Sequence, residues 1–198
     1  MTLTSKPLVS IEPPHRTANH MDLANYCLQT ARNARSASAS LSTLDTSIKN
    51  RWLDESADAL IAAGESIIRA NRVDLDAAPG DGLTDAAIDR LRLDETRLES
   101  IAGALREIQI LKDPGGEVLD GFTRPGGLQI LKKRVPLGGV FFIYESRPNV
   151  TADAAAICVK SGNAVILRGG KEAIHSSRAI VDVLSETARR VGLPEHAV

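Results

Sequence analysis

The stretch YESRPNVTADAAAICVKSGNAVILRGGK, residues 144–171, decides the fold expected for this chain. It joins the end of an apolar run, 139–144, to an alanine-rich segment, 151–161, and a second apolar run, 164–167. A strand, a helix and a second strand in this order predict a crossover unit with parallel strands. An amphipathic segment, 172–191, predicts a further crossover helix. Because continuous apolar strands are typical of parallel sheets, we expect the run 139–144 to be covered on both faces.

The preceding part of the chain has helical periodicity and then a turn-rich region. Helices are predicted over residues 21–40, 44–63, 65–78, 85–92 and 94–112. Two β-type runs, within 117–135, flank a Pro-Gly-Gly turn and predict a hairpin. The predicted class is therefore α/β. A flexible tail over residues 1–21 precedes one partial nucleotide-binding domain over 22–198. That domain comprises a helical part (22–112), the hairpin (117–135) and a βαβα part (139–192).

A helix that leads toward a third strand, with no third strand in the sequence, is an unfinished topology. Parallel sheets usually contain several strands. We therefore expect the sequence to be an N-terminal fragment of a longer protein.

Composition excludes several classes of function. The chain is 43% hydrophobic and 25% charged, with a net charge of −1, as in ordinary globular proteins. This balance favours neither nucleic acid nor an anionic membrane as a partner. No window approaches the ~20 apolar residues of a membrane span, and two cysteines fit a reducing compartment. A cytoplasmic protein is expected, and the four scattered histidines predict no metal site.

The turn Arg168-Gly169-Gly170-Lys171 is the first candidate for chemistry. It follows an apolar strand and precedes a helix, where ligands bind in open α/β sheets. The glycines would allow close backbone approach, and the helix N-terminus and two cations would favour a phosphate. The alternative is a tight βα turn with two solvated cations. Neither a GxGxxG nor a GxxxxGK[ST] motif is present.

The second candidate follows the other predicted strand, at the same end of the sheet. Asn149 lies just before a predicted helix, so its side chain could cap that helix or donate to a developing oxyanion. Arg147 could pair with a substrate carboxylate or simply with Glu145. Cys158 and Cys27 are interpreted as small core hydrophobes rather than nucleophiles, and Trp52 as a core anchor.

Several of these segments together resemble the gamma-glutamyl phosphate reductases (glutamate-5-semialdehyde dehydrogenases), in the aldehyde dehydrogenase superfamily. They are residues 144–171 with the preceding RVPLG at 134–138, GLTD at 82–85 with DRL at 89–91, and GEV at 116–118 with FTRP at 122–125. The similarity extends from about residue 22 to residue 198.

The resemblance implies a reaction. Members of the family use NADPH to reduce L-glutamyl 5-phosphate to glutamate 5-semialdehyde and phosphate, the second step of proline biosynthesis from glutamate. A cysteine thiolate attacks the acyl phosphate, and hydride then reduces the thioester. The domain over 22–198 would thus be a partial NADPH-binding domain. A homo-oligomer is implied for the full-length protein, the hairpin resembles the oligomerisation strands, and a functional association with glutamate 5-kinase is compatible with this reaction.

The resemblance also assigns residues. Asn149 matches the asparagine that stabilises the oxyanion, and Glu145 and Arg147 match residues near the acyl substrate. Arg168, with Gly169 and Gly170, matches the adenosine-ribose end of the cofactor site. Lys171 stands where many NAD-using relatives carry an acid, which suits the 2′-phosphate of NADPH.

The family's catalytic cysteine lies in a later domain, and neither cysteine of this chain matches it. The resemblance therefore implies that these 198 residues are inactive alone. The alternative is a non-catalytic module that binds a nucleotide or associates with a partner.

Overall fold

The computed structural model describes residues 17–198, with side chains from Leu23 onward. The helices are α1 (Thr17–Leu41), α2 (Thr46–Ala62), α3 (Gly64–Ala77), α4 (Asp85–Leu91), α5 (Glu95–Ile110), α6 (Pro148–Lys160) and α7 (Ile174–Val191), with the short 3₁₀ turn η1 (Lys171–Ala173). The strands are β1 (Val118–Thr123), β2 (Gln129–Lys133), β3 (Gly139–Ile143) and β4 (Ala164–Arg168). The α/β class with N-terminal helices, a hairpin and a βαβα part is confirmed.

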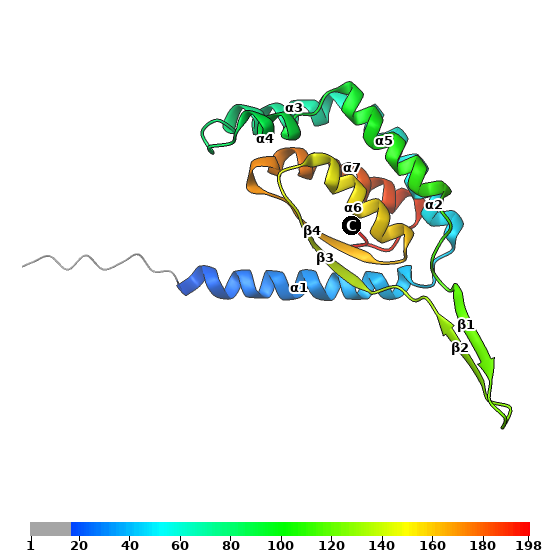
Figure 1. The fold of residues 1–198 in the computed structure, drawn as a ribbon. Coiled ribbons are helices and arrows are strands. Elements are labelled where there is room, and N and C mark those ends of the chain that lie inside the picture. Colours follow the sequence, from blue (N-terminus) through cyan, green and yellow to red (C-terminus); the bar gives the residue numbers. More distant parts are fainter. Residues whose placement is uncertain (1–16) are drawn as a thin grey trace, which may run out of the picture.

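The strands form two separate pairs. β1 and β2 pair antiparallel as the predicted hairpin, which extends away from the helices (Figure 1). β3 and β4 pair parallel, with Gly139 opposite Ala164 and Ile143 opposite Arg168. α6 covers one face of this parallel pair and α1 crosses the other. α7 lies beside α6, and α2, α3 and α5 pack outside these two helices.

One apolar cluster joins the helical part to the βαβα part. Trp52 is fully buried in it, and its indole Nε1 donates to the carbonyl oxygen of Leu184 at 3.1 Å. The predicted role of Trp52 as a core anchor is confirmed. Most helix ends follow sequence signals: Thr84 and Asp94 accept hydrogen bonds from the first turns of α4 and α5. Gly192 ends α7 with a φ of 87°, a left-handed conformation that glycine adopts easily.

Three expectations are wrong in detail. β3 is not covered on both faces, because Phe141 and Ile143 are 59% and 70% exposed on the face where α1 reaches Ala34 against Gly139. Cys27 is exposed on α1 rather than part of a core. α1 already begins at residue 17, so residues 17–21 of the predicted tail are helical, and the rest of that tail lies outside the described residues.

α6 also begins earlier than predicted, at Pro148 instead of residue 151. Proline suits the first helical position, since its missing N–H has no partner there in any helix and its φ is already helical. Asn149 therefore lies inside the first turn of α6 and not in front of it. In the part of the chain that the structure describes, no helix has both the length and the apolar character needed to cross a membrane.

Candidate functional site

The two turns that follow β3 and β4 meet at the carboxyl end of the parallel pair, as the sequence predicts. The backbone N–H of Tyr144 donates to the carbonyl oxygen of Arg168 at 3.1 Å, which extends the ladder by one residue. Beyond it, Ser146 Oγ donates to Glu172 Oε2 at 2.5 Å. This hydrogen bond lowers the pKa of the Glu172 carboxyl. The candidate residues 145–149 and 168–171 thus belong to one edge of the fold.

The glycines of the second turn have a structural reason to be glycine. A Cβ on Gly170 would overlap the Ser146 hydroxyl, and a Cβ on Gly169 would lie 3.1 Å from the Tyr144 ring. Both turns can approach each other only because these side chains are absent. Close packing of the two turns therefore accounts for the glycines without any ligand.

The charges at this edge are mixed. Lys171 is exposed, and its Nζ donates to Asp81 Oδ1 at 2.7 Å, a hydrogen bond that raises the pKa of the lysine. Arg168 is exposed, and its guanidinium donates to the neighbouring carbonyl oxygen of Gly169. Glu172, which sequence analysis did not single out, adds a carboxylate that contacts the turn after β3 through Ser146. The position of Glu172 directly after the candidate residue Lys171 is the feature of the sequence that could have indicated it.

The N-terminus of α7 is already capped by a carboxylate of the protein itself. Asp74, buried on α3, accepts hydrogen bonds from the backbone N–H groups of His175 (3.1 Å) and Ser176 (2.8 Å), and from Ser176 Oγ. Asn71, one turn earlier, donates to the same Ser176 hydroxyl. A phosphate at this edge would therefore depend on the side chains of Arg168 and Lys171 rather than on the N–H groups of α7.

Asn149 is exposed and points along α6. Its Nδ2 lies 3.4 Å from Asp153 Oδ2, at the long limit of a hydrogen bond. Burial raises the pKa of the Asp153 carboxyl, and the contact with Asn149 lowers it in part. The amide is thus held loosely and remains able to donate to another oxygen. Asp153 was missed by sequence analysis, although its spacing of four residues from Asn149 places the two on one helical face.

Arg147 pairs with Glu145, the simpler of the two alternatives. The distance from Arg147 Nε to Glu145 Oε1 is 2.8 Å, but the geometry is not that of a hydrogen bond, and Nε is otherwise buried without a partner. Three more arginines line a hollow next to Arg147 and Asn149, all from the region where α4 ends and α5 begins: Arg90, Arg92 and Arg97. Sequence analysis predicted helices over 85–92 and 94–112 in that region and did not single out these cations.

Neither cysteine provides a nucleophile at this edge. Cys158 is 7% exposed, and burial raises the pKa of its thiol. It follows Asn149 by nine residues on the same helix, which is about 14 Å along the axis. Cys27 lies on α1, which packs against β3 and β4. Within the described residues, no group of histidine, cysteine, aspartate and glutamate side chains could hold a metal ion.

Comparison with known proteins gives consistent relatives. The chain is 70% identical over 177 residues to a gamma-glutamyl phosphate reductase of Rhodopirellula baltica, and 50% identical over 178 residues to one of Clostridium novyi. These alignments cover 89% and 90% of this chain but only 41% and 43% of the relatives. The chain thus spans about two fifths of the length of the curated relatives it matches. No protein-family model matches it.

Solved structures support the same relationship. The crystal structure of gamma-glutamyl phosphate reductase from Thermotoga maritima superposes with a TM-score of 0.83 at 38% identity, covering 86% of this chain and 41% of that one. A probable aldehyde dehydrogenase from Listeria monocytogenes shares the fold, with a TM-score of 0.65 at 15% identity over 90% of this chain and 36% of that one. Over the length that they share, this chain is similar in sequence and in fold to the gamma-glutamyl phosphate reductases.

Proposed function

We propose that the chain carries one wall of the active site of an NADPH-dependent gamma-glutamyl phosphate reductase. The observation that carries the proposal is the 70% identity to a protein of that name over 89% of the chain. The arrangement at the carboxyl end of β3 and β4 supports it, since Asn149, Arg168 and Lys171 lie on one edge. The reaction proposed for the complete protein is reduction of L-glutamyl 5-phosphate to glutamate 5-semialdehyde and phosphate, in proline biosynthesis, in the cytoplasm.

Asn149 is proposed to stabilise the oxyanion that forms when a thiolate attacks the acyl phosphate. Its side-chain N–H groups are exposed at the first turn of α6, where the helix dipole also favours negative charge. Glu145 and Arg147 are proposed to lie beside the acyl substrate. The thiolate itself would come from outside these 198 residues, because Cys158 is buried and about 14 Å further along α6.

The residues at the second turn fit a nicotinamide dinucleotide, whose adenosine ribose would lie against Arg168, Gly169, Gly170 and Lys171. NADPH is proposed over NADH because Arg168 is a cation with no carboxylate partner in the described part of the chain. Lys171 contributes less, since Asp81 already holds its ammonium group. We expect Arg168→Ala to weaken NADPH binding about tenfold and NADH binding little, measured by fluorescence titration in the chimera described below.

A chimera tests the proposal. In the Rhodopirellula baltica reductase, the 177 matched residues are replaced by those of this chain. We expect phosphate-dependent reduction of NADP⁺ by glutamate semialdehyde, and none by the 198-residue chain alone. Asn149→Ala in the chimera should lower kcat by about 10²–10³-fold, like other losses of an oxyanion donor. Asn33→Ala on α1 is the control. A chimera that folds but has no activity would refute the proposed function.

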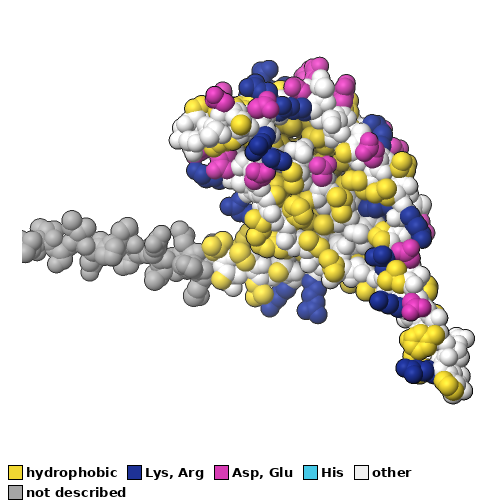
Figure 2. All heavy atoms as spheres, viewed as in Figure 1, with side chains coloured by type: hydrophobic (Ala, Val, Ile, Leu, Met, Phe, Trp, Pro, Cys, Tyr) yellow, Lys and Arg dark blue, Asp and Glu magenta, His cyan; other side chains and the backbone are white. Residues whose placement is uncertain are grey.

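In the complete protein, a homo-oligomer is proposed to form through the β1–β2 hairpin, which extends from the helices and exposes hydrophobic side chains (Figure 2). Phe122 and Leu131 are two of the exposed hydrophobic residues of this hairpin. Functional association with glutamate 5-kinase is also proposed, for a different reason: the product of that enzyme is the unstable acyl phosphate that this reaction consumes. Sedimentation of the chimera with the hairpin intact or shortened tests the first of these proposals.

A further inference from the structure

α6 and α7 both begin at the carboxyl end of the parallel pair, but their N-termini are satisfied differently. At α7 the carboxylate of Asp74 accepts hydrogen bonds from two backbone N–H groups. At α6, no side chain among residues 23–198 caps the helix: its N-cap residue is Arg147, and Pro148 has no N–H. The N–H of Val150 donates to the carbonyl oxygen of Arg147 at 3.1 Å, so the N–H of Asn149 and the helix dipole are what this end offers to an anion. The contact of Asp74 with α7 thus shows the type of hydrogen bond that an anion would accept at the N-terminus of α6.

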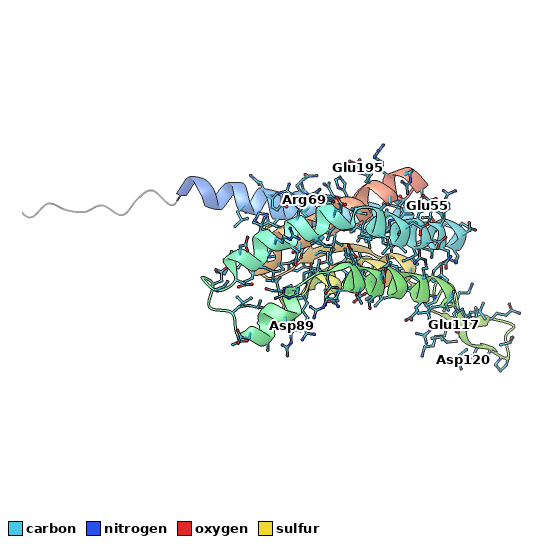
Figure 3. All side chains as sticks on the ribbon, turned by 90° about the horizontal axis from the view of Figure 1, so that it is seen from above. Glu55, Arg69, Asp89, Glu117, Asp120 and Glu195 are labelled. Carbon is cyan, nitrogen blue, oxygen red and sulfur yellow. The ribbon has the colours of Figure 1, made fainter. Side chains whose placement is uncertain are left out.

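A hollow of about 370 Å³ lies at this end of α6, close to the lower limit of ~300 Å³ for ligand pockets. Its walls come from the α4–α5 junction and from the turn before α6. The lining residues are Asp89, Arg90, Arg92, Leu93, Arg97, Ser100, Arg147 and Asn149. Figure 3 shows Asp89 on α4, at the opposite end of the molecule from Glu117 and Asp120 of the hairpin. We call the hollow formed by the eight lining residues the arginine hollow.

Two of the four arginines that line the arginine hollow, Arg97 and Arg147, have carboxylate partners. Asp89 accepts from Arg97, whose guanidinium also donates to the backbone carbonyl oxygens of Asp89 and Arg92. Glu145 pairs with Arg147.

Arg90 and Arg92 are exposed and form no ion pair with any side chain among residues 23–198. Arg147 Nε is buried and lies 2.8 Å from Glu145 Oε1, without hydrogen-bond geometry. Two guanidinium groups without an ion pair, beside a helix end without a side-chain cap, are suited to an oxyanion.

We propose that the arginine hollow binds an oxyanion, a carboxylate or a phosphate, at the N-terminus of α6. Assigning that oxyanion to the substrate rests on the proposed function; the binding of the anion does not. Glutamyl phosphate carries both groups, a carboxylate at one end and an acyl phosphate at the other. With Asn149 in the same hollow, an anion held by Arg92 and Arg147 would fix the distance between the carbonyl and the oxyanion donor.

Anion binding is tested on the 198-residue chain itself by NMR. Inorganic phosphate and glutarate are titrated separately at constant ionic strength, with chloride as the balancing salt. We expect saturable shifts of the backbone amides of Asn149 and Val150. The double variant Arg90→Gln/Arg92→Gln should weaken binding about tenfold. Arg32→Gln, on exposed α1, removes a comparable surface charge and should leave it unchanged.

The outcome distinguishes the two chemical sources. Tighter binding of phosphate assigns the hollow to the acyl phosphate, and tighter binding of glutarate assigns it to the substrate carboxylate. In the active chimera, the double variant should then raise KM for phosphate or for glutamate semialdehyde, respectively, with little change in kcat. Absence of saturable shifts at Asn149 and Val150, or equal weakening by Arg32→Gln, would overturn the proposal. An inactive chimera with intact anion binding would instead contradict only the proposed function.

Discussion

Replacing Asp113 by asparagine should destabilise the fold far more than an ordinary surface substitution. Asp113 follows α5, and its Oδ2 accepts hydrogen bonds from Lys49 Nζ and from Thr46 Oγ1 (2.7 Å) on α2. Its Oδ1 accepts the N–H of Gly115 at 2.8 Å. The side chains of Lys49 and Asp113 are only 6% and 13% exposed. One carboxylate therefore connects α2 to the segment that leads into the hairpin.

The expected loss is about 3 kcal/mol in the free energy of unfolding. Removing one partner of a buried pair typically costs ~3–5 kcal/mol, because the other charge stays buried without compensation. Asparagine keeps one carbonyl oxygen for Gly115, which favours the lower end of that range. Lys160 adds to the loss. Burial lowers the pKa of the Lys160 ammonium group; the charge of Asp113 opposes that effect, and the charge of Lys49 reinforces it. Asp113→Asn therefore removes the negative charge that offsets the repulsion between Lys49 and Lys160.

The loss should also depend on pH. Burial alone would raise the pKa of Asp113, but hydrogen bonds from Lys49, Thr46 and Gly115 together bring it below its ordinary value. A lowered pKa in the folded state contributes stability above the unfolded value of ~3.9, and this contribution is lost as the pH falls through the folded pKa. The difference between the native protein and Asp113→Asn should therefore be full at pH 7 and shrink below about pH 4.

Urea denaturation followed by fluorescence measures both effects, since Trp52 is the single tryptophan and is fully buried. Glu117→Gln is the control: it removes exposed pairs with Lys112 and Arg134 and should cost less than about 1 kcal/mol. The reasoning is refuted if Asp113→Asn costs no more than this control at pH 7. It is also refuted if its cost is the same at pH 3 as at pH 7.

Three further substitutions or modifications test other parts of the structure. Gly170→Ala should lower stability by about 1–3 kcal/mol, because its methyl group would overlap the facing turn, whereas Gly126→Ala, with open space around it, should be nearly neutral in the same urea assay. Asp74→Ala should cost about 1–2 kcal/mol and speed hydrogen exchange in the first turn of α7, since that turn loses its cap. In a thiol-reagent assay, Cys27 should react within seconds, and Cys158 only as the protein unfolds, because it is buried and its pKa is raised.

The fold was largely predictable because the relevant signals are local. Apolar runs and helical periodicity identified the strands and helices. Thr84, Asp94 and Gly192, residue types that favour helix ends, lie at ends of α4, α5 and α7. The helix predicted over 151–161 lacked its first residues, because the preference of proline for the first helical position was not applied to Pro148. The exposure of Phe141 was not predictable in this way, because an apolar run does not specify which neighbours cover it.

The candidate site was less predictable, because it depends on contacts between distant parts of the sequence. That residues 145–149 and 168–171 share one edge followed from parallel topology alone. The partners of those residues did not follow from it: Asp81 is 90 positions from Lys171, and the arginines at the α4–α5 junction are 52 to 59 positions from Asn149. No periodicity or local motif relates such pairs. They are brought together by the packing of α3 against α7, of α5 against α6 and of α4 against α3.

The position of Asp74 affects where an anion can bind along the edge formed by the turns after β3 and β4. Because its carboxylate occupies the N-terminus of α7, a second anion placed there would meet a buried negative charge. Binding of a dinucleotide phosphate near Gly169 and Gly170 would therefore depend on exposed side chains. One of these, Lys171, already pairs with Asp81. At the N-terminus of α6, no carboxylate from the described part of the chain accepts a hydrogen bond from the backbone N–H groups. Fixed recognition of an anion is thus expected at Asn149, on the substrate side, and adjustable recognition at Arg168, on the cofactor side.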